Sequence, residues 1–446
     1  MDNNTATAPR ARIAIVSPDG EVANELTLSL ERAGYQITEP KDGPADIGLV
    51  DLRNKRVTAK QAKSIAALLR HKSPESSIFF LIHPTLNTPA RTALKRYGET
   101  IPARNNFDHV VERCRQILRL RNVADEAGER MKTLATLNRL FEFPSIATSA
   151  KPINVLIAGP PSPTALATIS ATAKTAGKYV SVLSAGQALR AIDTGQFDCA
   201  IFLPSPKDSP LHSVTRAIRR HPKYAGLPII HVAEDEQNLQ QLAKYGASEF
   251  ILQQHVPHDL SARIQLNGRR ARLLRSMRTF LRACTGDGVR DKASHAFTPA
   301  FLAEHGARLS ARADHSGRPL TVVFIQLTCD NEDTTIHERM VLHRAAYLIN
   351  RITRAEDLTA RIAPDAFIVL CPATTKADAG KLALRIEGVI ANTVFRGRDR
   401  HSLHAIEAVT TICTRIPGAA IEEAVACAIK AARCIRGTTP LQQSPR

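Results

Sequence analysis

The sequence predicts an α/β protein: two tandem domains with doubly wound parallel sheets, followed by a third α/β domain. Short apolar runs alternate with amphipathic helical patterns through the first 265 residues, which is typical of βαβ units. The apolar runs of the N-terminal part recur in the same order about 150 residues later, which indicates a tandem duplication. The chain has 446 residues, enough for about three domains.

The first domain is expected at 11–120. Apolar runs at 13–16, 46–51 and 77–82 predict buried strands, and amphipathic segments between and after them predict helices. A charged segment at 121–150 is expected to form a helical linker.

The second domain is expected at 151–265. Runs at 154–159, 198–203 and 227–233 match the three strands of the first domain in order. The segment AKYGA at 243–247 likewise matches KRYGE at 95–99. Four matching elements in one order are hard to ascribe to chance, so we expect the same topology in both copies.

A second linker helix is expected at 266–290. The stretch 260–284 carries seven arginines: Arg263, Arg269, Arg270, Arg272, Arg275, Arg278 and Arg282. They could hold DNA phosphates or an acidic protein. The favoured alternative is a solvated linker helix whose apolar stripe packs between domains, because no helix-turn-helix or other reading element is visible.

The third domain is expected at 291–437, with strands at 319–327, 365–373 and 404–413, helices between them and a last helix. The tail, 438–446, is expected to be flexible.

Composition limits the function. The net charge is +18, which favours an anionic partner such as a nucleotide, nucleic acid, membrane surface or acidic protein. Aromatic residues make up only 4%, which argues against a base-stacking nucleic-acid platform. The eight cysteines form no C-x-x-C motif, so neither a disulfide framework nor a zinc site is expected. The N-terminus has no apolar signal segment and the longest charge-free stretch contains four prolines, so we expect a soluble, cytoplasmic protein without a membrane span.

The two N-terminal domains resemble phosphoacceptor receiver domains, which have a flavodoxin-like fold. Asp51 ends a predicted strand where that family places its phosphoacceptor. The family's Mg²⁺-binding acidic pair is replaced by Ser17 and Pro18, with Asp19 beside them, and Arg104 stands near its lysine. Asp51 is therefore either a poor phosphoacceptor or an exposed remnant.

The second receiver-like domain lacks the phosphorylation residues altogether. Leu203 stands at the acceptor position, Gly159 and Pro160 at the acidic pair, and Gln253 near the lysine. The resemblance implies a degenerate domain that serves dimerisation or docking, so a homodimer through the receiver domains is one expectation.

The third domain resembles the GGDEF domain, the diguanylate cyclase fold. The resemblance lies in two segments, RPLTVVFIQL at 318–327 and RAEDLTARIAPDAFIVLCP at 354–372. Gln326 replaces a metal-binding Asp, APDAF at 363–367 replaces the signature pentapeptide, and Thr298 aligns with a guanine-contacting Asn. Cyclisation of GTP needs two metal ions and glycines that let the backbone approach the nucleotide. We therefore expect no catalytic residues, no cyclase activity and no firmly held Mg²⁺.

A second site of the GGDEF family, the R-x-x-D allosteric product site for cyclic di-GMP, is retained. Arg354 and Asp357 stand five residues before the altered pentapeptide, and Arg385 stands at the place of an additional site arginine. An arginine suits guanine O6 and N7 or a phosphate, and a carboxylate can accept from guanine N1–H and N2–H. Lys178 is a candidate further contact from the second domain. The alternative is a surface ion pair three residues apart.

The receiver–receiver–GGDEF order resembles the PleD/PopA type, and the lost cyclase motif with a retained R-x-x-D resembles PopA in particular. That resemblance implies a protein with the architecture of a two-component response regulator that serves as a cyclic di-GMP adaptor. It also implies partners such as protease adaptors or cell-cycle regulators, and recruitment of a substrate to a ClpXP-type protease at a cell pole. A residual or partner-activated cyclase is the alternative, and a DNA-binding regulator is the least favoured hypothesis.

Overall fold

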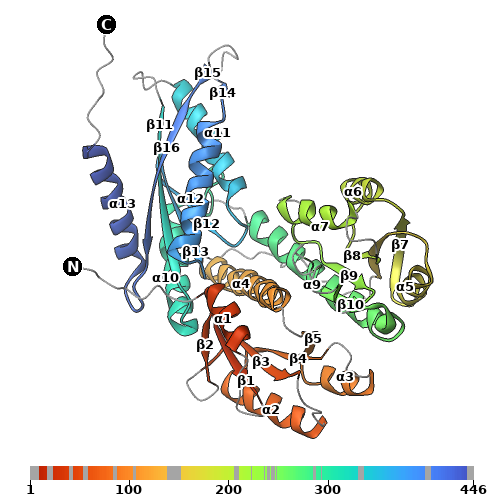
Figure 1. The fold of residues 1–446 in the computed structure, drawn as a ribbon. Coiled ribbons are helices and arrows are strands. Elements are labelled where there is room, and N and C mark those ends of the chain that lie inside the picture. The colour runs from red at the N-terminus through yellow and green to blue at the C-terminus, as the bar shows by residue number, and fades with distance from the viewer. Residues whose placement is uncertain are drawn as a thin grey trace. The chain divides into compact units, whose positions relative to one another are not determined.

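The computed structural model describes the following residues: 10–17, 24–39, 44–53, 59–83, 88–103, 107–137, 152–204, 210–221, 224–235, 237–238, 242, 247, 249–284, 288–292, 294–329, 336–396 and 403–438. The chain forms two compact units (Figure 1). The receiver unit comprises 11–121 and 144–276, and the C-terminal unit comprises 1–10, 122–143 and 277–446.

The first sheet of the receiver unit is parallel, in the order β2-β1-β3-β4-β5. Its strands are β1 (Arg12–Val16), β2 (Gln36–Thr38), β3 (Ile47–Leu52), β4 (Ser77–Ile82) and β5 (Glu99–Pro102). Its helices are α1 (Asn24–Arg32), α2 (Ala59–Lys72), α3 (Thr88–Lys95) and α4 (Asp108–Thr136). Successive side chains of a strand point to opposite faces. Ile13 and Ile15 accordingly pack with α1 and α4, whereas Ala14 packs with α2 and α3.

The second sheet repeats this topology, in the order β10-β9-β8-β6-β7. Its strands are β6 (Ile153–Ala158), β7 (Ala176–Val182), β8 (Cys199–Phe202), β9 (Ile229–Ala233) and β10 (Glu249–Leu252). Its helices are α5 (Pro163–Ala173), α6 (Ala185–Thr194), α7 (Pro210–Arg220), the 3₁₀ turn η1 (Gln253–His255) and α9 (Val256–Ala283). Both sheets place their first strand between the second and third, so the predicted duplication is confirmed.

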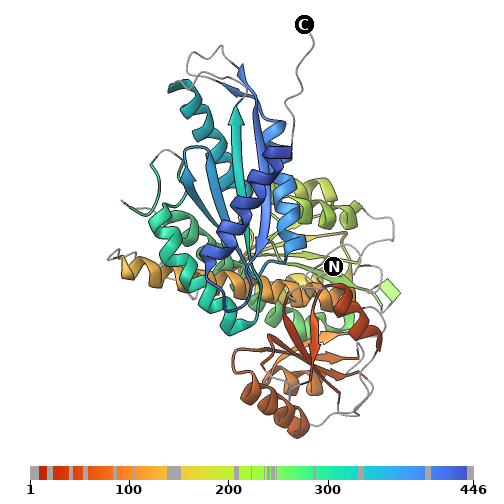
Figure 2. The ribbon, with the colours of Figure 1, turned by 90° about the vertical axis from the view of Figure 1, so that its left-hand side faces the viewer.

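The C-terminal unit contains a four-stranded antiparallel sheet in the order β12-β13-β11-β16. Its strands are β11 (Leu320–Cys329), β12 (Leu358–Ala363), β13 (Ala366–Pro372) and β16 (Ile406–Thr414), with a small ribbon of β14 (Phe395–Arg396) and β15 (Leu403–His404). Its helices are α10 (Pro299–Ser316), α11 (Ile336–Ile352), α12 (Lys376–Ala391) and α13 (Ile421–Thr438). Apolar residues of α11 and α12 form one core with the sheet, and α13 lies across the other face (Figure 2). The predicted fold class is confirmed.

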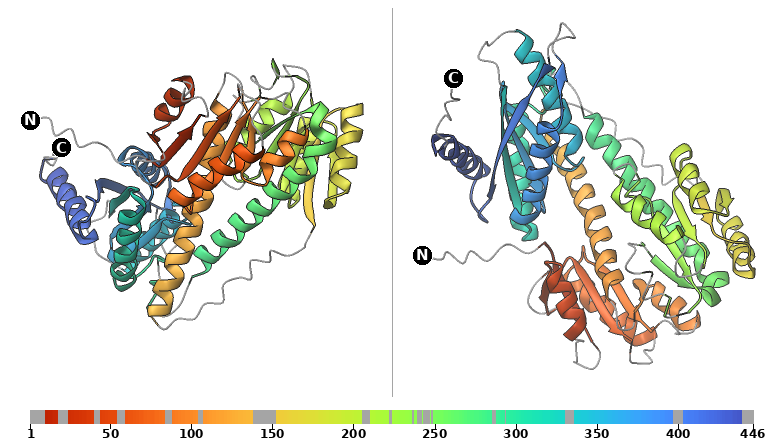
Figure 3. Two further views of the ribbon diagram at one scale, coloured as in Figure 1. Left: turned by 90° about the horizontal axis from the view of Figure 1, so that it is seen from below. Right: turned by 45° about the horizontal axis from the view of Figure 1, so that its top comes forward.

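Two long helices run past the domain boundaries that the sequence suggests. α4 is one unbroken helix through position 120, and α9 begins at Val256 and passes position 265 (Figure 3). The predicted linkers therefore start inside the last helix of each receiver-like domain, while the boundaries themselves stay predictions. Residues 138–150 of the first linker and 439–446 of the predicted flexible tail lie outside the described residues. No helix in the described part of the chain is long and apolar enough to cross a membrane.

Candidate ligand site in the C-terminal unit

In the first domain, the Asp51 carboxylate is held by a neighbouring arginine. Asp51 lies in β3, and Arg53 donates to its two carboxylate oxygens from Nε at 2.8 Å and from Nη2 at 2.6 Å. The Asp51 side chain is 9% exposed, which corrects the expectation of an exposed remnant. Pro18, Asp19 and Arg104 lie outside the described residues.

In the second domain, apolar packing fills the corresponding place. Leu203 is buried directly after β8. Gly159 adopts a φ of +146°, and a Cβ added to it would lie 2.6 Å from the Cβ of Leu203. Only glycine fits such a conformation and approach. Gly159 and the buried Leu203 therefore pack directly against each other at this end of the sheet.

The cyclase-type hairpin between β12 and β13 is closed by internal hydrogen bonds. Gln326 donates from Nε2 to Oδ2 of Asp365 at 2.5 Å. The backbone N–H of Leu327 donates to the Asp365 carbonyl at 2.9 Å. The Asp365 carboxylate is thus hydrogen-bonded to the Gln326 amide. An amide lacks the negative charge that a two-metal site requires of its ligands. The residues present do not fit the metal pair of a cyclase.

Arg361 and Thr298 also have structural partners. Arg361 donates to the carbonyls of Ala363 and Pro364 in the hairpin. Thr298 caps α10, since its hydroxyl oxygen accepts from the N–H of Phe301 and its hydroxyl donates to the Gly288 carbonyl at 2.7 Å. The position that aligned with a guanine-contacting Asn thus serves as a helix cap.

The retained R-x-x-D lies on the wall of a pocket of about 370 Å³. The pocket is built by the second half of α4, the end of α9, the segment before α10, α11 and the α11–β12 turn. Its charged and aromatic lining residues are Arg130, Arg282, Arg290, His295, Phe297, Tyr347, Arg351, Arg354 and Asp357. Five arginines and one carboxylate give the lining a positive net charge, although one of the arginines, Arg130, is ion-paired with the buried Glu126.

The turn that carries Arg354 and Asp357 is fixed by its own backbone. Oδ2 of Asp357 accepts the N–H of Arg354 at 2.9 Å, and the N–H of Asp357 donates back to the Arg354 carbonyl at 3.2 Å. Asp357 is 6% exposed, whereas the Arg354 side chain is exposed. The carboxylate is thus a fixed part of the wall, and the guanidinium can reach a ligand.

Burial sets the charge state of Asp357. Desolvation, with the nearby Glu356 carboxylate, raises the pKa of Asp357 to about 7, although Arg354 acts in the opposite direction. Asp357 can therefore exchange a proton near neutral pH, at the edge of a basic pocket.

Two further arginines of the wall were missed by sequence reasoning. The Arg290 guanidinium lies 4.0 Å from the Phe297 ring centroid, and that of Arg130 lies 5.0 Å from the same ring. Neither belongs to a motif, because Arg130 comes from a helix more than 200 residues before the R-x-x-D. Arg351, one helical turn before Arg354, was the one signal that sequence could have offered.

The remaining predicted contacts do not line this pocket. Arg385 lies on α12, is exposed, and donates to the Ile352 carbonyl at 3.0 Å, beside the turn. Lys178 is exposed on β7 of the receiver unit. Both stay predictions as ligand contacts.

Comparison with known proteins finds a distant relative of the chain. No family model matches the chain. Over 214 residues the chain is 25% identical to the response regulator PleD of Caulobacter vibrioides, a match that covers 46% of this chain and 47% of PleD. The chain is similar, at a distance, to PleD. The matched region spans about half of that relative's length.

Solved structures with a similar fold are GGDEF domains. The GGDEF domain of DgcB from Caulobacter crescentus in complex with c-di-GMP is 18% identical, with a TM-score of 0.32, over 34% of this chain and 90% of that one. The FimX GGDEF domain from Pseudomonas aeruginosa is 17% identical, with a TM-score of 0.30, over 33% of this chain and 94% of that one. The sheet topologies and the similarity to PleD give two receiver-like domains followed in the chain by a GGDEF-like α/β domain.

Proposed function

We propose that the protein is a non-catalytic cyclic di-GMP effector, an adaptor that binds this ligand at the R-x-x-D pocket and couples it to protein–protein interaction. The observation that carries the proposal is the basic pocket itself, with an exposed Arg354 beside a buried, fixed Asp357. Arg354, Asp357 and Arg385 are the proposed ligand residues, and Lys178 is a candidate additional contact.

The chemistry of the pocket suits a guanine dinucleotide. Arginine guanidinium groups match the oxygens of phosphates and the O6–N7 edge of guanine. An ionised Asp357 would accept from guanine N1–H and N2–H. Phe297 and Tyr347 offer aromatic surface in the same wall, on which a base can stack.

The proposal of an inactive cyclase rests on the hairpin. Gln326 binds Asp365, and Ala363 and Pro364 stand where the cyclase family has glycines. The alternative, a residual or partner-activated cyclase, predicts cyclic di-GMP from GTP with Mg²⁺ or Mn²⁺. Product formation that disappears in Asp365→Ala would establish that alternative and exclude ours.

A DNA-binding regulator is the third hypothesis, and the arginine-rich helix speaks against it. In α9, Arg270 pairs with Glu99 at 2.8 Å and Arg272 pairs with Asp198 at 2.5 Å. Arg263 and Arg275 form ion pairs with Glu249 and Asp198. Arginines paired with carboxylates of the protein contribute less to phosphate binding, while Arg269, Arg275 and Arg282 stay exposed.

The cellular role follows by resemblance. The similarity to the response regulator PleD supports a place in two-component and cyclic di-GMP signalling. The PopA-like pattern adds cell-cycle signalling in the cytoplasm, recruitment to a cell pole, and delivery of a substrate to a ClpXP-type protease through protein partners. A homodimer through the receiver domains belongs to the same proposal.

Titration calorimetry with cyclic di-GMP tests the site. The wild type should bind with a dissociation constant in the low micromolar range or below, about −8 kcal/mol or stronger. Arg354→Ala should cost about 2 kcal/mol, roughly thirtyfold, because a charge-assisted contact is lost. Arg433→Ala, an exposed arginine on α13, is the matched control and should bind as the wild type does. If Arg354→Ala binds cyclic di-GMP as tightly as the wild type, the R-x-x-D is a surface ion pair and not the ligand site.

A further inference from the structure

Two cysteines lie on neighbouring elements of the C-terminal unit. Cys413 is the last residue but one of β16, and Cys427 lies in the second turn of α13. Both are thiols in this structure. α13 packs against β16 on the face of the sheet opposite to α11 and α12 (Figure 2). The two cysteines therefore belong to elements that are in direct contact.

The alternation of side chains along β16 directs Cys413 toward α13. Thr410 donates to a carboxylate oxygen of α12 at 2.5 Å, whereas Thr411 donates to the Ala428 carbonyl of α13 at 2.6 Å. Successive side chains of a strand point to opposite faces. Cys413 accordingly shares the α13 face of the strand with Thr411, and Cys427 directly precedes the residue that Thr411 contacts.

The two thiols also interact with each other. Burial raises the pKa of the Cys413 thiol, and a hydrogen bond with Cys427 and the charge of Cys427 raise it further. A hydrogen bond joins atoms that are in contact. Two cysteines whose side chains meet can be joined by a disulfide with little movement of the backbone.

The two thiols differ in exposure. Cys427 is exposed, whereas Cys413 is half-buried. The susceptibility of a thiol to oxidation follows its exposure as well as its thiolate character. A small oxidant in the solvent therefore meets Cys427 first, with the Cys413 thiol beside it as the second reactant.

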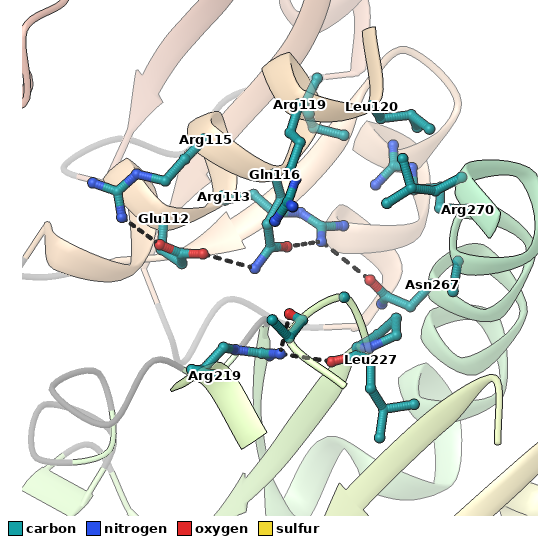
Figure 4. Close-up of a pocket in the computed structure, with 16 residues that line it drawn as sticks. Glu112, Arg113, Arg115, Gln116, Arg119, Leu120, Arg219, Leu227, Asn267 and Arg270 are labelled. Atoms are coloured by element: carbon teal, nitrogen blue, oxygen red, sulfur yellow. Dashed lines mark hydrogen bonds and ion pairs between the residues drawn. The ribbon is translucent and has the colours of Figure 1, made fainter. Parts of the chain in front are cut away.

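Four other cysteines are buried in the cores of the described residues: Cys114, Cys199, Cys284 and Cys371. Cys114 lies on α4 between Arg113 and Arg115, which line a pocket of the receiver unit (Figure 4), but its own side chain packs into the core of the first sheet. Burial raises the pKa of Cys114 to about 12. A thiol buried in this way is inert, so exposure distinguishes Cys427 from these residues.

Cys434 is also exposed on α13, seven residues after Cys427. Seven residues rise about 10 Å along a helix, whereas the Cα atoms of a disulfide lie within about 7 Å of each other. Cys427 and Cys434 thus cannot form a disulfide with each other while α13 is intact. The folded chain favours Cys413 as the partner of Cys427.

We propose that Cys413 and Cys427 form a peroxide-sensitive dithiol site, in which oxidation joins β16 to α13 through a reversible disulfide. The peroxide converts the Cys427 thiol to a sulfenic acid and releases one water. The Cys413 sulfur then attacks the Cys427 sulfur, and the sulfenic hydroxyl leaves as a second water with the proton of the Cys413 thiol. The two sulfur atoms together lose two electrons, which the peroxide oxygens gain. The site does not depend on the proposed function of the R-x-x-D pocket.

Mass spectrometry of tryptic peptides tests this site, because trypsin places the three cysteines on different peptides. Cys413 lies in 401–415, Cys427 in 416–430 and Cys434 in 434–436. The reduced protein is treated with hydrogen peroxide, its remaining thiols are alkylated, and the digest is analysed without reductant. The variants are Cys413→Ser and Cys427→Ser, with Cys434→Ser as the matched control. Thermal melting checks that each variant is folded.

The native wild type should yield a disulfide between peptides 401–415 and 416–430, and dithiothreitol should remove it. Cys413→Ser and Cys427→Ser should lose this product, whereas Cys434→Ser should form it at the wild-type yield. In urea, where α13 is unfolded, Cys427 should pair with Cys434 as well. Absence of the product from the native wild type overturns the proposal. Native pairing of 401–415 with 434–436 instead, or a native mixture equal to that in urea, also overturns it.

Discussion

Asp357 is the buried carboxyl group of the R-x-x-D pocket, and its environment favours the protonated form. Its pKa is raised to about 7 by burial and by Glu356, whereas an unfolded Asp has a pKa near 4. Between these pH values the folded state holds a proton that the unfolded state has released. Stability should therefore fall as the pH rises from about 4 to about 7, and change no further above that.

Asp357→Asn should remove this dependence. Across the window the wild type should lose on the order of 4 kcal/mol relative to the variant. Urea unfolding at several pH values gives the free energy of unfolding of both proteins. The difference between the two free energies cancels the contribution of all other titrating groups. Parallel stability curves for the two proteins would mean that Asp357 titrates normally.

Asp51 allows a second prediction at the scale of single residues. Acetyl phosphate with Mg²⁺ should label the protein poorly, because both oxygens of the acceptor carboxylate are engaged by Arg53. Intact-mass measurement gives the labelled fraction, with Asp51→Asn as the background. Stoichiometric labelling that Asp51→Asn abolishes would show that the Arg53 contact opens readily and that the site accepts phosphate.

At the scale of elements, α3 and α9 are joined by a buried ion pair. Arg91 donates to Asp259 at 3.0 Å, and both side chains are 2% exposed. Lys95 binds the same carboxylate at 2.7 Å but is 29% exposed. Removal of one partner of a buried pair leaves the other charge desolvated, whereas a partly exposed lysine contributes less.

Asp259→Ala should therefore destabilise the protein by about 3–5 kcal/mol, and Lys95→Ala by less than about 1 kcal/mol. Chemical unfolding of the two variants provides the comparison. The double variant Arg91→Met with Asp259→Leu should regain most of the loss, because an apolar pair removes both buried charges. A full-sized loss in Lys95→Ala would indicate that the lysine, not Arg91, is the principal partner.

The elements themselves could be predicted from sequence because they depend on local pattern. The runs at 13–16, 46–51 and 77–82 became β1, β3 and β4. The partners of α9 could not be predicted, since Asp198 and Glu99 lie 74 and 171 residues away from the arginines that they bind. Charge patterns of one helix reveal its cations but not the distant carboxylates that the fold brings to them.

The candidate ligand site was predictable to the same extent. Arg354 and Asp357 follow from a local motif, and their turn between a helix and a strand follows from the neighbouring patterns. Arg130 and Arg290 could not be found, because they reach the pocket through the packing of α4 and of the segment before α10. The burial that raises the pKa of Asp357 is likewise a property of the folded domain.

At the scale of the whole molecule, the R-x-x-D pocket lies where both long helices end. Arg130 of α4 donates from Nη1 to the Leu281 carbonyl in the last turn of α9 at 2.9 Å. Arg290 donates to the Cys284 carbonyl at 2.5 Å. Both arginines also line the pocket. Because α4 and α9 each contribute residues to both compact units, a ligand here would act on the segments that connect them.

Cyclic di-GMP should therefore slow amide hydrogen exchange at 278–284 by about tenfold or more, since local opening must break contacts that the ligand orders. Exchange mass spectrometry with and without ligand measures this, and α13 serves as an internal region whose exchange should not change. Arg290→Ala should still bind, because Arg354 and Asp357 remain, but should lose the protection of 278–284. If saturating ligand binds in an Arg354-dependent way but leaves exchange at 278–284 unchanged, the ligand does not stabilise the ends of the two helices. The proposed adaptor would then lack this route of coupling.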